Sequence, residues 1–336
     1  MITVVIPLFN GARYIRRSVQ SVLGQSYTDF ELIVVDDGSE DGGAEIVLAF
    51  TDPRLRLVRQ ENQGVSAARN KGIVEGRGQS IAFLDADDAW DCGFLDALVN
   101  LSRIYPQAGI YGTGFRMLFP EGPGVEVTAA EAAHQETSLL LTDYFYRADG
   151  GNLINASGMM IPRRIFEAVG VFLIGEHQGE DVEMWARIAL RFPIGYDTRI
   201  LFSVHQTGII NKPRYKNIPK YSPKIEMLQK ALDKSPDSLV HREMIRSHIK
   251  TFLRKRCLFF VLNYKRADTV EFMLNSQAAT WAPLLDRLIK ISLLWPFMKL
   301  AAWFGRAAHS RPALRILGGQ CVSHGVLMRV RAGIVD

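Results

Sequence analysis

The sequence predicts an α/β fold: a mostly parallel sheet with helices on both faces, followed by a helical C-terminal region. Two observations support this prediction. Short apolar runs alternate with helix-like segments through the first half of the chain, which is the order expected when helices join the strands of a parallel sheet. The run Leu32-Ile33-Val34-Val35 also lacks polar alternation, as expected for a strand that is buried on both faces.

The first 105 residues carry the regular part of this pattern. The apolar runs that predict strands cover residues 3–7, 31–35, 55–58 and 80–84. The helix-like segments cover residues 14–23, 44–50, 66–75 and 93–104. Because ligands of such sheets bind beyond the carboxyl ends of the strands, the polar residues that follow each strand are the first candidates for a functional site.

The pattern is less regular after residue 105. The elements expected there are a strand pair within 108–119 around Gly112 and Gly114, a short helix over 139–146, loops at 150–151 and 156–158, a helix over 181–191 and a strand over 194–204. After about residue 215 the chain becomes helical and basic. We therefore expect a domain of residues 1–214, with halves 1–105 and 106–214, and a separate region of residues 215–336.

Composition and cysteine usage limit the class of protein. With 336 residues, 48% of them hydrophobic, the chain is globular and too long for one small core. Its three cysteines, Cys92, Cys257 and Cys321, lie far apart without CxxC spacing. This argues against a disulfide framework or a zinc site and favours a reducing compartment. No basic leader precedes the first apolar run, so we expect no secretory signal.

Charge is distributed unevenly along the chain. Residues 1–210 hold 17 Lys and Arg against 27 Asp and Glu, a net charge of −10, whereas residues 211–336 hold 23 against 8, a net charge of +15. A strongly basic segment attracts phosphate-bearing polymers or anionic membrane surfaces. Nucleic acid is not the expected partner, because the aromatic and basic interleaving of a known nucleic-acid module is missing from the sequence.

Three carboxylates follow the fourth predicted strand. Asp85 and Asp87 flank Ala86, so in an extended chain their side chains share one side. Two carboxylates a short distance apart suit a hard divalent cation that keeps water and phosphate oxygens as further ligands. The alternative is a solvated acidic turn in which Asp88 caps the helix after Trp90.

Two further strand ends carry polar residues. Asp37 lies in a glycine-containing turn, where a carboxylate can accept hydrogen bonds from a base or ribose; the alternative is a turn held by an Asx-type bond. Asn62 and Gly64 lie in a loop that leads into the third helix, whose N-terminus suits phosphate. Arg69 on that helix can reach a diphosphate or base, or can be a surface arginine on an amphipathic helix.

Two residues of the second half complete the candidate set. Asp181 lies one turn before Trp185 on the apolar face of its predicted helix. An inward carboxylate at a helix N-terminus is either a cap or a general base, and the helix dipole keeps it ionised. His205 follows an apolar run; on its own, a core or surface histidine is the simpler interpretation.

These motifs occur together in one order. They read VVIPLFN and VVDDGS near the start, then ENQGVSAARNKGI, IAFLDADDAW, GEDVEMWARIA and FSVHQTGI. Over about residues 1–210 the chain resembles the family 2 glycosyltransferases, which have the Rossmann-like GT-A fold. Residues 106–178 match no named subfamily, and the last 120 or so residues lie outside the resemblance.

The resemblance implies an inverting glycosyltransferase of bacterial polysaccharide type. Such an enzyme moves a sugar from a nucleotide-diphosphate donor, most commonly a UDP-sugar, to a hydroxyl of a saccharide or lipid-linked saccharide. The resemblance also makes residues 1–105 the nucleotide-binding half and residues 106–214 the acceptor half. The implied product is a cell-surface polysaccharide or glycolipid.

The resemblance also implies a role for each candidate residue. The donor-nucleotide site would contain Pro7, Phe9, Asn10, Asp37, Asn62, Gly64, Arg69, Asp85 and Ala86. Asp87, in the DXD motif, and His205 would hold Mg²⁺ or Mn²⁺ against the donor diphosphate. Asp181 would be the base that removes the acceptor proton, and Glu180 would orient the acceptor.

The basic C-terminal region contains an apolar stretch with charges in it. Residues 281–306 are rich in Leu, Ile and Trp, but charged residues and Pro296 interrupt them. The stretch is too short and too broken for a membrane span, so we expect a helix lying at the membrane interface. This predicts a cytoplasmic protein, peripheral at the inner face of the plasma membrane. The alternative is a core helix pair bent at Pro296.

Two other functions fit parts of the pattern. A nucleotidyltransferase also pairs an α/β sheet with acidic metal ligands, but its activating lysine and glycine-rich start are not visible. A catalytically silent GT-A-like module tethered to a membrane would need none of Asp85, Asp87 and Asp181. Donor-dependent turnover separates an enzyme from such a module.

Overall fold

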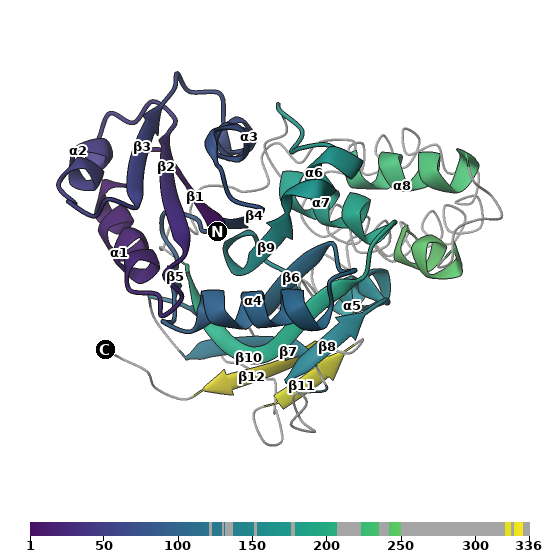
Figure 1. The fold of residues 1–336 in the computed structure, drawn as a ribbon. Coiled ribbons are helices and arrows are strands. Elements are labelled where there is room, and N and C mark those ends of the chain that lie inside the picture. The colour runs from purple at the N-terminus through teal and green to yellow at the C-terminus, as the bar shows by residue number, and fades with distance from the viewer. Residues whose placement is uncertain are drawn as a thin grey trace, which may run out of the picture.

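The computed structural model describes residues 1–120, 123–129, 131, 137–150, 153–175, 179–206, 223–234, 242–249, 320–323 and 326–331. Within these residues the strands form one twelve-stranded sheet, whose main path has the order β11-β12-β7-β6-β9-β4-β1-β2-β3. The ribbon is shown in Figure 1. The α/β fold class predicted from the sequence is confirmed.

The first half of the chain forms the parallel part of the sheet. Its strands, in spatial order, are β4 (Ser80–Phe83), β1 (Ile2–Leu8), β2 (Phe30–Asp36) and β3 (Leu55–Arg59). Every residue of β1 and β2 is buried. This is the burial expected from their unbroken apolar sequences.

Helices cover both faces of this parallel part. α1 (Ala12–Leu23) and α2 (Gly43–Leu48) lie on one side of β1–β3, and α3 (Val65–Glu75) lies on the other (Figure 1). Val5 faces α3 so closely that a Cβ on Gly72 would lie 2.3 Å from its Cγ1 atom, whereas Leu8 faces Gly43 of α2. The two strand residues point to opposite faces because they are an odd number of positions apart.

The second half of the chain continues the sheet with mixed pairing. Its elements are β5 (Ala89–Trp90), α4 (Phe94–Ile104), β6 (Ile110–Leu118), β7 (Gly124–Ala129), β8 (Ser138–Leu141), α5 (Tyr144–Gly150), the 3₁₀ turn η2 (Ala156–Gly158), β9 (Met159–Pro162), α6 (Arg163–Val169), α7 (Glu180–Ala189) and β10 (Ile194–His205). β9 pairs antiparallel with both β4 and β6 and so joins the halves, and β10 runs parallel to β6.

Two predictions for the second half were wrong in detail. Residues 110–118 form one continuous strand rather than a strand pair, because the glycines serve close packing and not a turn. A Cβ on Gly114 would lie 2.9 Å from Ile200 Cδ1 and 3.0 Å from Thr128 Cβ. The short helix expected over 139–146 is divided between the end of β8 and the start of α5.

The described part of the C-terminal region contains helices and strands. Residues 223–234 form α8 and residues 242–249 are also helical. The prediction of a helical region was wrong near the end, where β11 (Gln320–Ser323) and β12 (Val326–Arg331) form an antiparallel pair that continues the sheet from β7.

The predicted membrane segment cannot be placed. Residues 281–306 lie outside the described residues. Among the helices that are described, none has the length and hydropathy of a membrane span.

Gly158 provides a direct test of the packing between η2 and β10. A Cβ at this position would lie 2.0 Å from Cε1 of Phe202, whose ring is itself stacked on Phe115. We expect Gly158→Ala to lower the free energy of unfolding by about 1–3 kcal/mol, because the rigid ring has no room to move. Gly93→Ala is the control, since a Cβ there meets no atom within 4 Å. Equal urea midpoints for the two variants would contradict this packing.

Candidate active site

The ends of three parallel strands bring the candidate residues to one edge of the sheet. β1 is in register with β2 from Ile2–Phe30 to Leu8–Asp36, and with β4 as far as Val5–Phe83. The loops that follow these strands therefore meet beyond their carboxyl ends. They carry the predicted residues after β1, after β2 and after β4, as expected for a ligand site in a sheet of this kind.

Asp37 organises the loop before α3. Its buried carboxylate accepts hydrogen bonds from the Gln60 side chain at 2.7 Å, from the Gln63 backbone N–H at 2.9 Å and from the Gly64 N–H at 2.8 Å. Gly64 has a φ of 89° at the start of α3, a conformation that favours glycine. Asp37 thus fixes the loop that contains Asn62, and its contact with a nucleobase remains a prediction.

The loop after β1 presents one aromatic side chain to solvent. Phe9 is 53% exposed, whereas Pro7 is buried within β1. The next residue, Asn10, has a positive φ of 49°, and its Oδ1 atom accepts a hydrogen bond of 3.0 Å from the Glu40 N–H. The Asn10 side chain therefore fixes the loop, and Phe9 is the residue available to stack on a base.

The acidic segment divides into two kinds of carboxylate. Asp85 and Asp87 are half-buried, as is Ala86 between them, whereas Asp88 is buried. Asp88 accepts hydrogen bonds from the Ser157 hydroxyl and, at 2.9 Å, from the His205 backbone N–H. Burial, with the neighbouring carboxylates, raises the pKa of Asp88 to about 8. Asp88 therefore stabilises the local structure through its contacts with Ser157 and His205.

Ser157 is a supporting residue that the sequence did not reveal. Its hydroxyl oxygen accepts a hydrogen bond of 3.2 Å from the Asp85 N–H, and its carbonyl accepts one of 2.6 Å from the Trp90 indole. The sequence showed only a loop of small residues there. A preceding Asn, which caps η2 through a hydrogen bond from the Ser157 N–H, was the one local sign of a specific turn.

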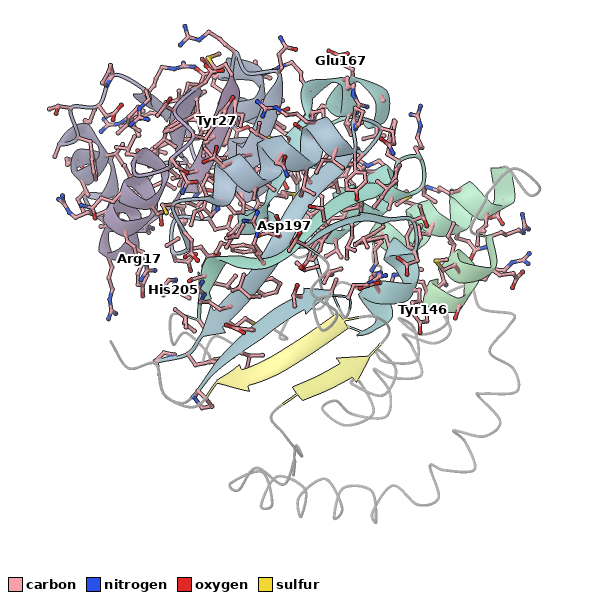
Figure 2. All side chains as sticks on the ribbon, turned by 60° about the horizontal axis from the view of Figure 1, so that its bottom comes forward. Arg17, Tyr27, Tyr146, Glu167, Asp197 and His205 are labelled. Carbon is pink, nitrogen blue, oxygen red and sulfur yellow. The ribbon has the colours of Figure 1, made fainter. Side chains whose placement is uncertain are left out.

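Arg17 is a second residue that the sequence did not reveal, and it lies beside His205. Figure 2 shows the two side chains next to each other, Arg17 from α1 and His205 from the end of β10. The Arg17 guanidinium donates to the Asp87 carbonyl. Burial and the positive charge of Arg17 lower the pKa of His205 to about 4, so its imidazole is neutral at pH 7.

These residues fit a divalent cation in part. The buried Nδ1 atom of His205 has no hydrogen-bond partner among the described residues, and a neutral imidazole with a free lone pair is a metal ligand. The carboxylate of Asp87 would supply the hard oxygen that Mg²⁺ or Mn²⁺ prefers. No cluster of three His, Cys, Asp or Glu suited to a metal occurs in the described part of the chain, so phosphate and water oxygens would complete the coordination.

Arg69 lies between the two halves of the site. It is 3% exposed. One terminal nitrogen of its guanidinium is 2.8 Å from Asp85, and the other is 3.0 Å from Glu180. The sequence placed Arg69 and Asp85 with the nucleotide and Glu180 with the acceptor, and the structure joins all three.

Asp181 follows Glu180 in the first turn of α7. Burial raises the pKa of its carboxyl to about 6, Glu180 adds to the rise, and Arg69 opposes it. Tyr144 of α5 lies close enough for the Asp181 charge to raise the pKa of its phenol further. A carboxylate whose pKa is near neutral can take a proton from a hydroxyl more readily than an ordinary aspartate.

The comparisons with known proteins agree with this geometry. Residues 3–168 match the model of glycosyl transferase family 2. An uncharacterised glycosyltransferase of Rickettsia felis is 27% identical over 204 residues, which are 60% of this chain and 33% of that protein. Residues 3–168 of the chain belong to glycosyl transferase family 2.

Solved structures share the fold at low identity. TarS 1–349 of S. aureus, crystallised with UDP-GlcNAc, superposes with a TM-score of 0.63 at 16% identity, covering 81% of this chain and 78% of that one. The mannosyltransferase PcManGT of Pyrobaculum calidifontis, with GDP-Man and Mn²⁺, gives a TM-score of 0.53 at 17% identity, covering 94% and 87%. These matches confirm the GT-A fold.

The relatives are longer than the region they share with this chain. The matched residues span from 33% to 66% of the length of four curated Rickettsia relatives.

Proposed function

We propose that the chain is an inverting glycosyltransferase. It would move a sugar from a nucleoside diphosphate donor to a hydroxyl of a saccharide or lipid-linked saccharide, in the synthesis of a cell-surface polysaccharide or glycolipid. The observation that carries the proposal is the junction at Arg69. Arg69 joins Asp85, a carboxylate of the acidic strand end, to Glu180 on the acceptor side, and the next residue, Asp181, has a carboxyl with a raised pKa.

The donor site would lie at the carboxyl ends of β1, β2 and β4. Phe9 would stack on the base, and the loop held by Asp37 would surround the nucleoside. The nucleotide sugars named for TarS and PcManGT support a nucleoside diphosphate donor. We propose a uridine carrier first.

Asp87 and His205 would hold Mg²⁺ or Mn²⁺ at this site. A divalent cation offsets the negative charge that builds on a departing diphosphate. Arg17, whose guanidinium donates to the Asp87 carbonyl, would keep this part of the acidic segment in place. The Mn²⁺ in the PcManGT complex supports the choice of metal.

Asp181 would take the proton of the acceptor hydroxyl. As the acceptor oxygen forms its bond to the anomeric carbon, the bond from that carbon to the diphosphate oxygen breaks, and the proton passes to Asp181. Attack opposite to the leaving group inverts the anomeric configuration. The first turn of α7 favours the ionised carboxylate before the reaction.

Nucleotide binding tests the donor half of the proposal without knowledge of the sugar. In calorimetric titrations, UDP is expected to bind the wild-type protein with Mn²⁺ present and to bind at least tenfold more weakly in EDTA. GDP and dTDP serve as comparisons for the base. Failure of all three nucleotides to bind with Mn²⁺ would overturn the assignment of the donor site.

The pH dependence of turnover tests the acceptor half. Because Asp181 must be ionised to accept a proton, and its pKa is about 6, kcat is expected to fall as pH decreases through about 6. It should change little between pH 7 and 8. Circular dichroism at each pH shows whether the fold is retained. A kcat that stays level down to pH 5 would exclude Asp181 as the base with this pKa.

The membrane contact through residues 281–306 and the peripheral location at the inner membrane face stay predictions, because that segment lies outside the described residues.

A further inference from the structure

Arg69 is buried and bound through both terminal nitrogens of its guanidinium, whereas its Nε atom has no hydrogen-bond partner among the described residues. Its side chain is nearly fully buried, and its two terminal nitrogens donate to different carboxylates at 2.8 and 3.0 Å. The guanidinium also lies over the ring of Phe172, 5.5 Å from its centre. A buried arginine with two carboxylate partners and an aromatic face has one available position. The ion pairs to Asp85 and Glu180 engage both terminal nitrogens of the guanidinium.

The next residue fastens α3 to the same region. The Asn70 side chain donates to the Phe172 carbonyl at 2.8 Å and accepts from the Phe172 N–H at 3.0 Å. Two consecutive residues of α3 therefore hold the second half of the chain. The N-terminus of α3 is fixed by the loop that Asp37 organises, so one helix links the nucleotide side to the acceptor side.

We propose that Arg69 is a positioning residue that couples the donor-side carboxylate Asp85 to the acceptor-side pair Glu180 and Asp181. This inference rests on the proposed function and changes the role predicted for Arg69 from nucleotide contact to a bridge between the two sites. Its positive charge offsets the electrostatic repulsion among these three carboxylates in a largely buried region. A ligand that neutralises Asp85 would therefore change the electrostatic potential that Asp85 and Arg69 together produce at Asp181.

The charges around Asp181 give the bridge a measurable effect. Glu180, on the same helix, and Asp85, after β4, both disfavour its ionised form, and Arg69 favours that form. Tyr144 of α5 faces it as a neutral phenol. Loss of Arg69 is therefore expected to raise the pKa of Asp181, and loss of the Glu180 charge to lower it. The opposite directions distinguish coupling from general damage to the site.

The test compares the acid limb of the pH profile, the range in which kcat falls as pH decreases, in four proteins. They are the wild type, Arg69→Met, Arg69→Lys and Glu180→Gln. In Arg69→Met the limb is expected to move up by about one pH unit, the size of shift that one close opposite charge produces. This lowers the ratio of kcat at pH 6 to kcat at pH 8 by about fivefold relative to wild type. Glu180→Gln should move the limb down. Arg69→Lys should fall between wild type and Arg69→Met, because a single ammonium keeps the charge but cannot bridge two carboxylates as a planar fork does.

Arg187→Met is the matched control. Arg187 is also a partly buried arginine paired with a glutamate, at 2.7 Å from Glu183 on α7, but it contacts neither proposed site. Its loss is expected to lower the melting temperature and to leave the acid limb unchanged. Arg69→Met with an unchanged limb and weakened UDP binding in Mn²⁺ would overturn the bridge and make Arg69 a nucleotide ligand.

A second measurement does not depend on turnover. In thermal unfolding, the effects of Arg69→Met and Glu180→Gln are expected to be non-additive, because the two residues share one ion pair. Additive effects would overturn the inference. Non-additive effects in a protein without turnover on any donor would support the bridge while rejecting the proposed function, so the two failures can be told apart.

Discussion

Asp181→Asn is expected to lower kcat for sugar transfer by about 10²–10⁴-fold, the contribution typical of a positioned general base. The amide is nearly the same size but cannot accept the acceptor proton. UDP affinity in Mn²⁺ should be retained, because Asp181 lies on the acceptor side of Arg69. The measurement is steady-state release of nucleoside diphosphate with saturating donor, together with calorimetry on the same preparations.

Asp96→Asn is the control for Asp181→Asn. Asp96 is an exposed carboxylate in the first turn of α4, so the same chemical change occurs at a helix N-terminus outside the site. Its kcat should match that of wild type. A folded Asp181→Asn protein with wild-type turnover would exclude Asp181 as the base.

Asp87→Ala is expected to remove the metal dependence of both binding and turnover. Charge stabilisation by a cation contributes several kcal/mol, so kcat should fall by about 100-fold or more. The variant with Mn²⁺ should behave like the wild-type protein in EDTA, which provides an internal reference. The measurements are Mn²⁺ titrations of turnover and of UDP affinity. A variant whose turnover responds to Mn²⁺ as the wild type does would show that Asp87 does not hold the metal.

The regular half of the fold could be predicted because its signals are local. β1, β2, β3 and β4 are apolar runs, and the helices between them differ from their predicted bounds by a few residues at most. The error at Gly112 and Gly114 has a different origin. Glycine allows a turn, but it also allows close approach, and only the position of Ile200 and Thr128 decides between the two.

The site could be predicted in part for a related reason. Asp85 and Asp87 stand out in the sequence because they follow an apolar segment, and Asp181 stands out because it lies one turn before Trp185 on the apolar face of its helix. The functions of Asp88, Ser157 and Arg17 depend on partners that lie 69 to 117 residues away, and no local pattern encodes such contacts. Arg69 was found as a candidate, but its pairing with Glu180 arises only in the folded chain, which brings Arg69 of α3 to the first turn of α7.

The most direct test of sugar transfer is release of nucleoside diphosphate from a panel of UDP-, GDP- and dTDP-sugars, with Mn²⁺ or EDTA and with saccharide and lipid-linked acceptors. Wild-type protein is expected to turn over one donor in Mn²⁺, with an acceptor-dependent rate that Asp181→Asn lacks. No release from any donor with either kind of acceptor, by protein that is folded and binds UDP, would contradict the enzyme and favour a silent binding module.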